Sequence, residues 1–438
     1  MLPLIIDTFF RIVFYITCGL SLLYCVLTFF VLLFVKRRPE SAESIPDEKL
    51  PYVTVQIPTY NELAGINCAA RCLNFDYPHA KLQIILGDDS NRPEISAQID
   101  AFVQKHPRIT LSRRASNVGY KPGNLNQMNT LSTGEYILIF DSDFLPEKDF
   151  LRKIVAPVVH DPSLAGVQAT WLVENVYQNF TTLMAASIVN IIHRIILPIL
   201  DRTAHGGIFC GSAELVRKDL LLRYGGWTPG TLTEDVDYSL RIIADGHRIL
   251  YLDNVFCSGE VPYMVRDLSR QQMRWAYGVI RAFLDNGKRL FASRVAKLGM
   301  KLAVICFASG YLLFSSLLLC FFAGLLQILV TATIAPPPVY PDHRWYQVGG
   351  YAVVDFLITG GFLIAGVVGG FIAGFSPRCS FKLVLSSLTI GFVLMFYIGK
   401  GIFLALCGLP MQWFMVRKNG NSTGISSHIP WHCPPCKG

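Results

Sequence analysis

Charged residues are scarce in this chain of 438 residues, and that scarcity narrows the class of protein. Only 16% of the residues are charged, 52% are hydrophobic, and the mean hydropathy is +0.40. This composition excludes an ordinary soluble protein and indicates a membrane protein with a sizeable soluble part. The net charge of +8 suits anionic lipids and an anionic substrate. It forms no basic stripe with interleaved aromatic residues, so we expect no nucleic-acid partner.

A disulfide framework is also missing. The 12 cysteines follow no framework spacing. Several lie inside apolar runs, where they act as small buried hydrophobic residues in a reducing compartment: Cys18, Cys25, Cys306 and Cys320. One Cys-x-x-Cys with two histidines on the C-terminal tail is too weak a pattern to predict a zinc site: His428, His432, Cys433 and Cys436.

The first apolar run indicates a membrane span. Residues 12–35 carry no charge, and a span needs roughly 20 apolar residues. A signal peptide would have a core of roughly 7–15 residues and a small-residue cleavage site, and neither is present. Lys36, Arg37 and Arg38 follow at once. By the positive-inside rule they predict that the next segment lies in the cytosol. We expect a multi-pass protein of the plasma (inner) membrane.

The chain becomes strongly apolar again after Lys301. Residues 302–334 and 348–375 are predicted spans, joined by a Pro-rich loop whose Trp345 and Tyr346 suit the membrane interface. Residues 381–407 contain Lys400, which leaves open a third span or a helix lying in the interface.

One further apolar stretch lies within the soluble part. Residues 180–200 contain Asn190, His193, Arg194 and Pro198, which argue against a span. We expect a buried or interfacial amphipathic helix there.

The segment between the spans has the pattern of an α/β domain. Apolar runs at residues 53–58, 82–89 and 136–143 each end in polar residues, and helix-like stretches follow at 62–72, 93–106 and 147–158. This alternation predicts βαβ units and a Rossmann-like, mostly parallel sheet. Ligands of such sheets bind beyond the carboxyl ends of the strands, where the acidic clusters of this sequence lie.

Two acidic clusters follow predicted strands. The carboxylates of Asp141-Ser142-Asp143 can hold Mg²⁺ or Mn²⁺, which prefer oxygen ligands and keep substrate phosphates in their shell. Asp88 and Asp89 close an earlier strand, and Lys121 lies in a Gly-rich loop from which a lysine can approach a diphosphate. Each feature alone also fits an ordinary turn or a surface lysine.

Two later motifs suit transfer to an acceptor hydroxyl. In Thr233-Glu234-Asp235, we predict that Asp235 is the general base that removes the proton of an attacking hydroxyl. The alternative is a simple helix cap by the threonine. In Gln271-Gln272-Met273-Arg274-Trp275, helical spacing places Gln271, Arg274 and Trp275 near one face, where Arg274 can pair with phosphate and Trp275 can stack on a sugar.

Taken in order, these motifs resemble the D, DxD, TED, QxxRW signature of processive family 2 glycosyltransferases, which include cellulose, chitin, hyaluronan and mannan synthases. The resemblance covers residues 50–290. It implies a GT-A-type catalytic domain, a UDP- or GDP-sugar donor, a divalent metal, and inverting transfer to a β-linked glycan acceptor. It also predicts four regions, at residues 1–38 (N-terminal helix), 45–295 (catalytic domain), 300–410 (membrane and interfacial helices) and 411–438 (polar tail).

The same resemblance assigns roles to particular residues. Asp235 and Glu234 are the expected catalytic residues, and Asp141 and Asp143 the expected metal ligands. The expected contacts of the nucleotide sugar are Thr59, Tyr60, Glu62, Asp88, Asp89, Lys121 and Asp141. The expected contacts of acceptor and diphosphate are Cys210, which lies in Phe209-Cys210-Gly211-Ser212, and Gln271, Arg274 and Trp275. Residues 414–419 only partly match the gating loop of bacterial cellulose synthase.

Other functions remain to be compared. A transferase that adds one sugar to a membrane lipid, such as ceramide or polyprenyl phosphate, is the alternative within enzymes. A transporter or channel is disfavoured, because the ionisable clusters lie in the soluble part. Glycan export would need an accessory subunit or an oligomer, because the chain ends soon after residue 419.

The topology gives a first testable prediction. A lysine inside a span costs roughly 2.5–3.5 kcal/mol on insertion scales, so we favour residues 381–407 as an interfacial helix and the tail as cytosolic. A thiol reagent that cannot cross membranes should therefore leave Cys433 and Cys436 unlabelled in intact cells. Labelling there would place the tail outside and make the segment a true span.

Overall fold

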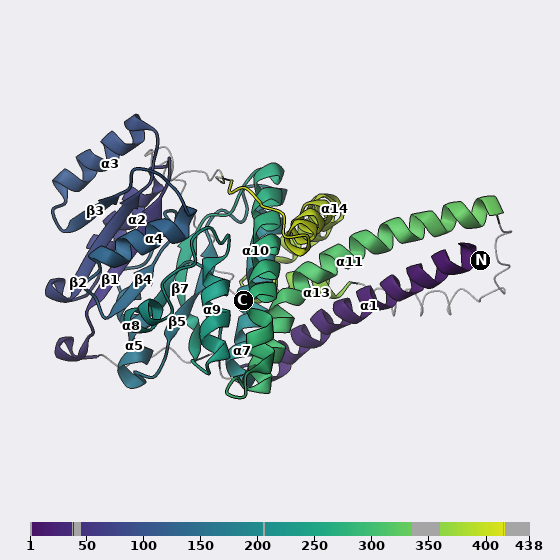
Figure 1. Ribbon diagram of the computed structural model, residues 1–438, viewed down its shortest axis with the longest axis horizontal. Helices are drawn as coiled ribbons and strands as arrows, with labels where there is room; N and C mark the ends of the chain where they lie inside the picture. Colours follow the sequence, from purple (N-terminus) through teal and green to yellow (C-terminus); the bar gives the residue numbers. More distant parts are fainter. Residues whose placement is uncertain are drawn as a thin grey trace.

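The computed structural model describes residues 2–36, 38, 45–204, 206–334, 360–414 and 416. The predicted interfacial loop with Trp345 and Tyr346, the first part of the predicted span 348–375, and the histidines and cysteines of the tail lie outside the described residues. An α/β domain forms one end of the molecule, and two long helices extend away from it (Figure 1).

A seven-stranded sheet forms the centre of the α/β domain, in the order β3-β2-β1-β4-β6-β5-β7. β6 is antiparallel to both of its neighbours, and the remaining pairs are parallel. The prediction of a mostly parallel α/β sheet is thus confirmed. The strands are β1 (Val53–Thr59), β2 (Leu82–Asp88), β3 (Ile109–Arg113), β4 (Tyr136–Ile139), β5 (Gly166–Val173), β6 (Glu214–Arg217) and β7 (Ile249–Gly259).

Helices cover both faces of this sheet, which explains the continuous apolar runs. Ile84 and Leu86 of β2 enter one hydrophobic cluster, whereas Ile85 between them enters another. Successive side chains of a strand point to opposite faces of the sheet, and because both faces are covered, all three of these side chains are buried. The helices of the domain are α2 (Ala64–Leu73), α3 (Pro93–Lys105), α4 (Tyr120–Leu131), α5 (Phe150–His160), α8 (Lys218–Arg223) and α9 (Glu234–Ala244).

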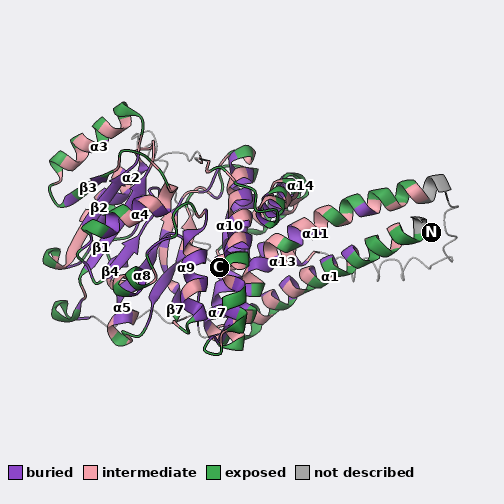
Figure 2. Ribbon diagram, viewed as in Figure 1, coloured by how far each residue is buried: buried purple, intermediate pink, exposed green. Residues whose placement is uncertain are grey.

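Within the described residues, four helices are long and apolar enough to cross a membrane: Leu4–Phe34, Phe180–Ala204, Leu298–Val330 and Pro377–Leu406. The first and third belong to α1 (Leu2–Phe34) and α11 (Leu298–Ile334), which lie side by side and expose apolar side chains along much of their length (Figures 1 and 2). This surface suits a lipid environment.

The apolar stretch that starts at Phe180 is enclosed by protein. It consists of α6 (Phe180–Asn190), a π-helical turn η3 (Ile191–Ile196) and α7 (Leu197–Ala204). The most apolar window of Phe180–Ala204 is 94% buried. Of the two predicted alternatives, the structure therefore shows the buried helix.

Two helices of the C-terminal region differ from α11. The first is shorter, and the second runs in another direction. α13 (Gly361–Ile372) has 12 residues, about 18 Å at 1.5 Å per residue, and does not by itself cross a hydrocarbon core of about 30 Å. Figure 1 views α14 (Pro377–Leu406) nearly along its axis, while α1 and α11 extend across the view. Pro377–Leu406 is long and apolar enough to cross a membrane, so the interfacial orientation of this segment stays a prediction.

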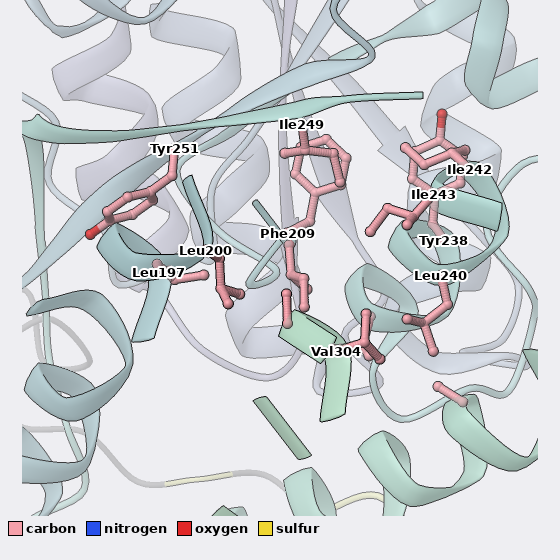
Figure 3. Packing of buried hydrophobic residues seen from close by; sticks show 14 of the residues in the cluster. Leu197, Leu200, Phe209, Tyr238, Leu240, Ile242, Ile243, Ile249, Tyr251 and Val304 are labelled. Atoms are coloured by element: carbon pink, nitrogen blue, oxygen red, sulfur yellow. The ribbon is translucent and has the colours of Figure 1, made fainter. Parts of the chain in front are cut away.

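The amphipathic helix α10 (Val265–Ala292) joins the α/β domain to the membrane helices. It packs on α9 and on α14. One hydrophobic cluster also contains Phe209, Tyr238 of α9 and Ile249 of β7 together with Val304 of α11 (Figure 3). The α/β domain and α11 therefore share a core.

Close approach of α14 to α10 requires a glycine. A Cβ atom at Gly401 would lie 2.4 Å from the backbone oxygen of Met273, whereas one at Gly391 meets only the end of Met184 at 3.9 Å. We expect Gly401→Val to destabilise the protein by about 1–3 kcal/mol through overpacking. Gly391→Ala is the control and should be neutral or stabilising. Thermal melts in detergent check this, and equal melting temperatures would contradict the assigned contact.

Candidate active site

A single cavity brings together almost all of the residues that the sequence singles out. Its walls come from the carboxyl ends of the strands, the first turns of α4 and α9, one face of α10, and the segment after α14. The predicted residues that line it are Thr59, Tyr60, Glu62, Asp89, Lys121, Asp141, Asp143, Cys210, Glu234, Asp235, Gln271, Arg274 and Trp275.

The exception is Asp88, which lies behind the wall. It is fully buried, and its Oδ2 accepts hydrogen bonds from Arg113 at 2.8 Å and from the Ser96 hydroxyl at 3.0 Å. Burial alone would raise the pKa of Asp88, but the hydrogen bonds from Ser90, Arg113 and Ser96 outweigh it and hold the pKa below its usual value. Asp88 thus anchors the end of β2, and only its neighbour Asp89 faces the cavity.

Asp89 is positioned by Thr59 and by Arg114, and the sequence did not single out Arg114. Its backbone N–H donates to the carbonyl of Thr59 at 3.1 Å, which joins the ends of β1 and β2. Its carboxylate accepts from Nε of Arg114 at 2.9 Å, and Arg114 also donates to the carbonyl of Val118 at 2.8 Å. The pair of Asp89 and Arg114 therefore holds the loop that leads into α4.

Lys121 lies at the centre of the site. Its ammonium is 2.7 Å from Oδ1 of Asp141 and 2.9 Å from Oε1 of Glu234, and it donates to the carbonyl of Gly211 at 2.5 Å. Burial would lower the pKa of Lys121, but the carboxylates of Asp141 and Glu234 outweigh it and raise the pKa. Lys121 therefore stays charged and links α4, the end of β4 and α9.

The two carboxylates of the Asp141-Ser142-Asp143 motif both face the cavity. The backbone N–H of Asp141 donates to the Ser212 hydroxyl at 2.9 Å, and Oδ2 of Asp143 accepts from the backbone N–H of Glu260 at 3.0 Å. The Ser142 hydroxyl donates to Glu62.

These carboxylates fit a cation that also binds a diphosphate. Among the described residues no group of three or more His, Cys, Asp or Glu side chains is placed to hold a metal. Mg²⁺ commonly takes one or two protein carboxylates and completes its shell with substrate phosphates and water. Asp141 and Asp143 offer that number of hard oxygen ligands.

Asp235 has the properties of a base that works near neutral pH. It lies half-buried in the first turn of α9, and its Oδ2 would be 3.1 Å from a Cβ atom at Gly211. Gly211 has φ 88°, so both its backbone and this close approach favour glycine. Burial and the negative charge of Glu234 raise the pKa of Asp235 to about 7, while Lys121 opposes them.

Two tryptophans line the cavity. Trp275 lies on the cavity face of α10, and Trp171 of β5 donates from its indole nitrogen to the carbonyl of Ser212 at 2.9 Å. Trp171 lies within β5 and has no local sequence signal, because the sheet order, with β6 between β4 and β5, brings it to the cavity.

The chain returns to the cavity after α14. Trp413 packs against Tyr60 and Tyr120, with ring centroids 5.7 Å and 6.4 Å apart, and Arg270 lies over the ring of Phe414 at 4.8 Å. Phe414 and Val416 also line the cavity. They are the described residues of the partial gating-loop match, and Met415 and residues 417–419 lie outside the described part.

Comparisons with known proteins agree with this geometry. The chain is 30% identical over 299 residues to the probable glucomannan 4-beta-mannosyltransferase 1 of Arabidopsis thaliana, which covers 63% of this chain and 54% of that protein. It is 28% identical over 388 residues to the probable glucomannan 4-beta-mannosyltransferase 11 of the same plant, covering 86% and 83%. The chain thus spans about half of the first relative and most of the second.

A solved structure shows the same fold over nearly the whole chain. The mannosyltransferase PcManGT from Pyrobaculum calidifontis, in complex with GDP-Man and Mn²⁺, superposes with a TM-score of 0.61 at 19% identity, covering 92% of this chain and 99% of that one. The family described as "Glycosyltransferase like family 2" matches residues 51–278, the segment from β1 to the aromatic face of α10. This match covers more than half of the chain, and the chain therefore belongs to the family 2 glycosyltransferases.

Proposed function

We propose that this protein transfers mannose from GDP-mannose to the end of a growing β-linked polysaccharide, with inversion at the anomeric carbon and with a divalent cation. The observation that carries the proposal is the position of Asp235 in the same cavity as Asp141 and Asp143, with Lys121 between the two groups. The choice of mannose and of GDP rests on what the named relatives transfer and on what PcManGT binds.

The donor would lie along the strand ends. Tyr60, Glu62 and Asp89 line the part of the cavity near β1 and β2 and would contact the nucleoside. Lys121 and Arg274 place positive charge beside the diphosphate, and charge-assisted hydrogen bonds to phosphate are short and strong. Trp413 would close the cavity over the nucleoside, since its ring already contacts Tyr60.

Mg²⁺ or Mn²⁺, held by Asp141 and Asp143, would supply Lewis-acid stabilisation of the leaving diphosphate. Asp235 removes the proton of the acceptor hydroxyl while that oxygen forms a bond to C1 of mannose. The bond from C1 to the phosphate oxygen breaks, and GDP leaves with the electron pair. One protein carboxylate suffices as the base, because no protonated leaving group is needed.

The catalytic domain would face the cytosol, where nucleotide sugars are made. Lys36 and Arg38 follow α1 on the side of the α/β domain, and Arg38 pairs with Asp201 of α7 at 2.6 Å. A positively charged end of α1 beside this domain is the arrangement that the positive-inside rule favours. The plasma membrane is the proposed location.

The central experiment tests donor and metal together. Purified protein should release GDP from GDP-mannose in the presence of Mn²⁺ or Mg²⁺ and build a product that β-mannanase digests, and a chelator should abolish both.

We expect Asp143→Asn to lower turnover by about 10²-fold or more, since a lost transition-state electrostatic contact typically costs that much. Asp149→Asn, an exposed carboxylate of the same domain, should retain activity. Turnover only with another nucleotide sugar would overturn the donor assignment, and full activity in chelator would overturn the metal assignment.

The raised pKa of Asp235 predicts a pH dependence. A general base works only when deprotonated, so the rate should fall as the pH drops through about 7. Glu234→Gln removes the negative charge that helps to raise the pKa of Asp235. The acidic limb of the variant's pH profile should therefore lie at lower pH than that of the wild type, whatever the maximal rate of the variant. Profiles of kcat/KM against pH for both proteins check this. An identical limb in both would show that another group titrates.

A further inference from the structure

A tight turn lies between the proposed base and the proposed metal ligands. It consists of residues 210–213, just before β6, and its first two residues line the cavity. The carbonyl of Gly211 accepts a hydrogen bond from Nζ of Lys121 at 2.5 Å. The Ser212 hydroxyl accepts from the backbone N–H of Asp141 at 2.9 Å. The position of the 210–213 turn is therefore linked to the positions of the lysine and of a metal ligand.

The turn also lies against the base. A Cβ atom at Gly211 would be 3.1 Å from Oδ2 of Asp235 and 3.5 Å from Nζ of Lys121. A shift of the backbone at this point would therefore displace the carboxylate of Asp235 or the ammonium of Lys121.

The backbone of the turn is unfavourable by itself. Gly211 has φ 88°, which glycine tolerates, but Ala213 has φ 51°, in the left-handed region that residues with a side chain rarely adopt. Such a conformation costs about 1–3 kcal/mol and persists only where the surrounding structure holds it. The contacts that hold the turn are therefore needed for its shape.

Two buried polar side chains supply these contacts. Gln168 of β5 and Glu214 of β6 lie opposite each other in the antiparallel pair of strands, and they are 0% and 1% exposed. Oε1 of Gln168 accepts from the backbone N–H of Cys210 at 2.8 Å, and its Nε2 donates to the carbonyl of Ser212 at 3.0 Å. Oε2 of Glu214 accepts from the backbone N–H of Gly211 at 2.8 Å. One cross-strand pair thus binds three successive residues of the turn.

The polar nature of this pair is costly for the fold alone. An apolar pair would pack between the strands without burying a carboxylate, and such replacements are often neutral or stabilising. It would, however, leave the backbone N–H groups of the turn without these partners. Neither Gln168 nor Glu214 lines the cavity, so both can act on the reaction only through the turn.

We infer that Gln168 and Glu214 are positioning residues of the sugar transfer. They fix the 210–213 turn, and the turn places Lys121 and Asp141 relative to Asp235. This inference rests on the proposed function and deepens it, since it adds to the reaction two residues that lie outside the cavity. A misplacement of about 1 Å can lower the rate of a reaction about 10²-fold, so the loss of either side chain should be measurable in turnover.

The test replaces each side chain by methionine, which has a similar length but does not hold the backbone by strong hydrogen bonds. With GDP-mannose as donor, we expect Gln168→Met and Glu214→Met each to lower kcat about 10- to 100-fold. The KM for GDP-mannose should change by less than about threefold, because the contacts that are lost serve the transition state. Glu214→Gln should recover most of the lost kcat, since its amide oxygen can still accept from the N–H of Gly211.

Gln56→Met is the matched control. Gln56 is a fully buried side chain of β1 in the same sheet, and its Nε2 donates to Oδ1 of Asn129 at 2.8 Å, outside the cavity. This variant should lose melting temperature as the others do, but should keep the kcat of the wild type at a temperature where it is folded. Thermal melts in detergent establish that temperature for every variant.

Three results would overturn the inference. They are an unchanged kcat in both turn variants, an equal loss of kcat in Gln56→Met, and no recovery of kcat in Glu214→Gln over Glu214→Met. If neither methionine variant folds, Ser212→Ala takes their place, because it removes only the hydroxyl that binds the N–H of Asp141. It should likewise lower kcat with little change in KM, and an unchanged kcat would again contradict the positioning role.

The wild type separates this inference from the proposed function. If the wild type does not turn over GDP-mannose, the proposed donor is wrong, and the same comparison is made with the nucleotide sugar that it does use. A wild type that is active with GDP-mannose, together with turn variants of unchanged kcat, refutes the roles of Gln168 and Glu214 alone.

Discussion

The site depends on one ammonium group among several carboxylates. Lys121 neutralises Asp141 and Glu234 within 3 Å of both, and Asp235 and Glu214 lie close enough for their charges to influence one another. Burial and the charge of Asp235 raise the pKa of Glu214 well above its usual value. Carboxylates packed this densely would repel one another without the lysine. The negative charges of the neighbouring carboxylates also raise the pKa of Asp235.

This arrangement also connects the parts of the fold. Lys121 comes from the first turn of α4, Asp141 follows β4, and Glu234 begins α9, so one cation ties three elements at the open edge of the sheet. On the other side, a shared core joins the α/β domain to α11 through residues such as Tyr238 and Val304 (Figure 3). The residues of the cavity are therefore held between the sheet and the helices α10 and α11.

The segment after α14 returns to the end of β1. α14 packs on α10 and directs the following segment back over the cavity, where Trp413 contacts Tyr60 beyond β1. The close contact at Gly401 sets the position of that segment. A change in how α14 packs against α10 would thus alter how the part of the cavity near Tyr60 is covered.

The sequence by itself determined the α/β fold with its mostly parallel sheet, the strands that bear the acids, and the membrane helices flanking the domain, because apolar periodicity and strand-end acids are local patterns. It also predicted the residues that the cavity gathers, although their individual roles stay predictions. Tertiary structure alone decided that Asp88 pairs with Arg113 behind the wall while Asp89 faces the cavity, and that the stretch beginning at Phe180 is enclosed by protein. It also brought Trp171 and Trp413 to the site. These choices depend on sheet order and on helices that are distant in the chain, and such long-range packing leaves no pattern in the neighbouring residues.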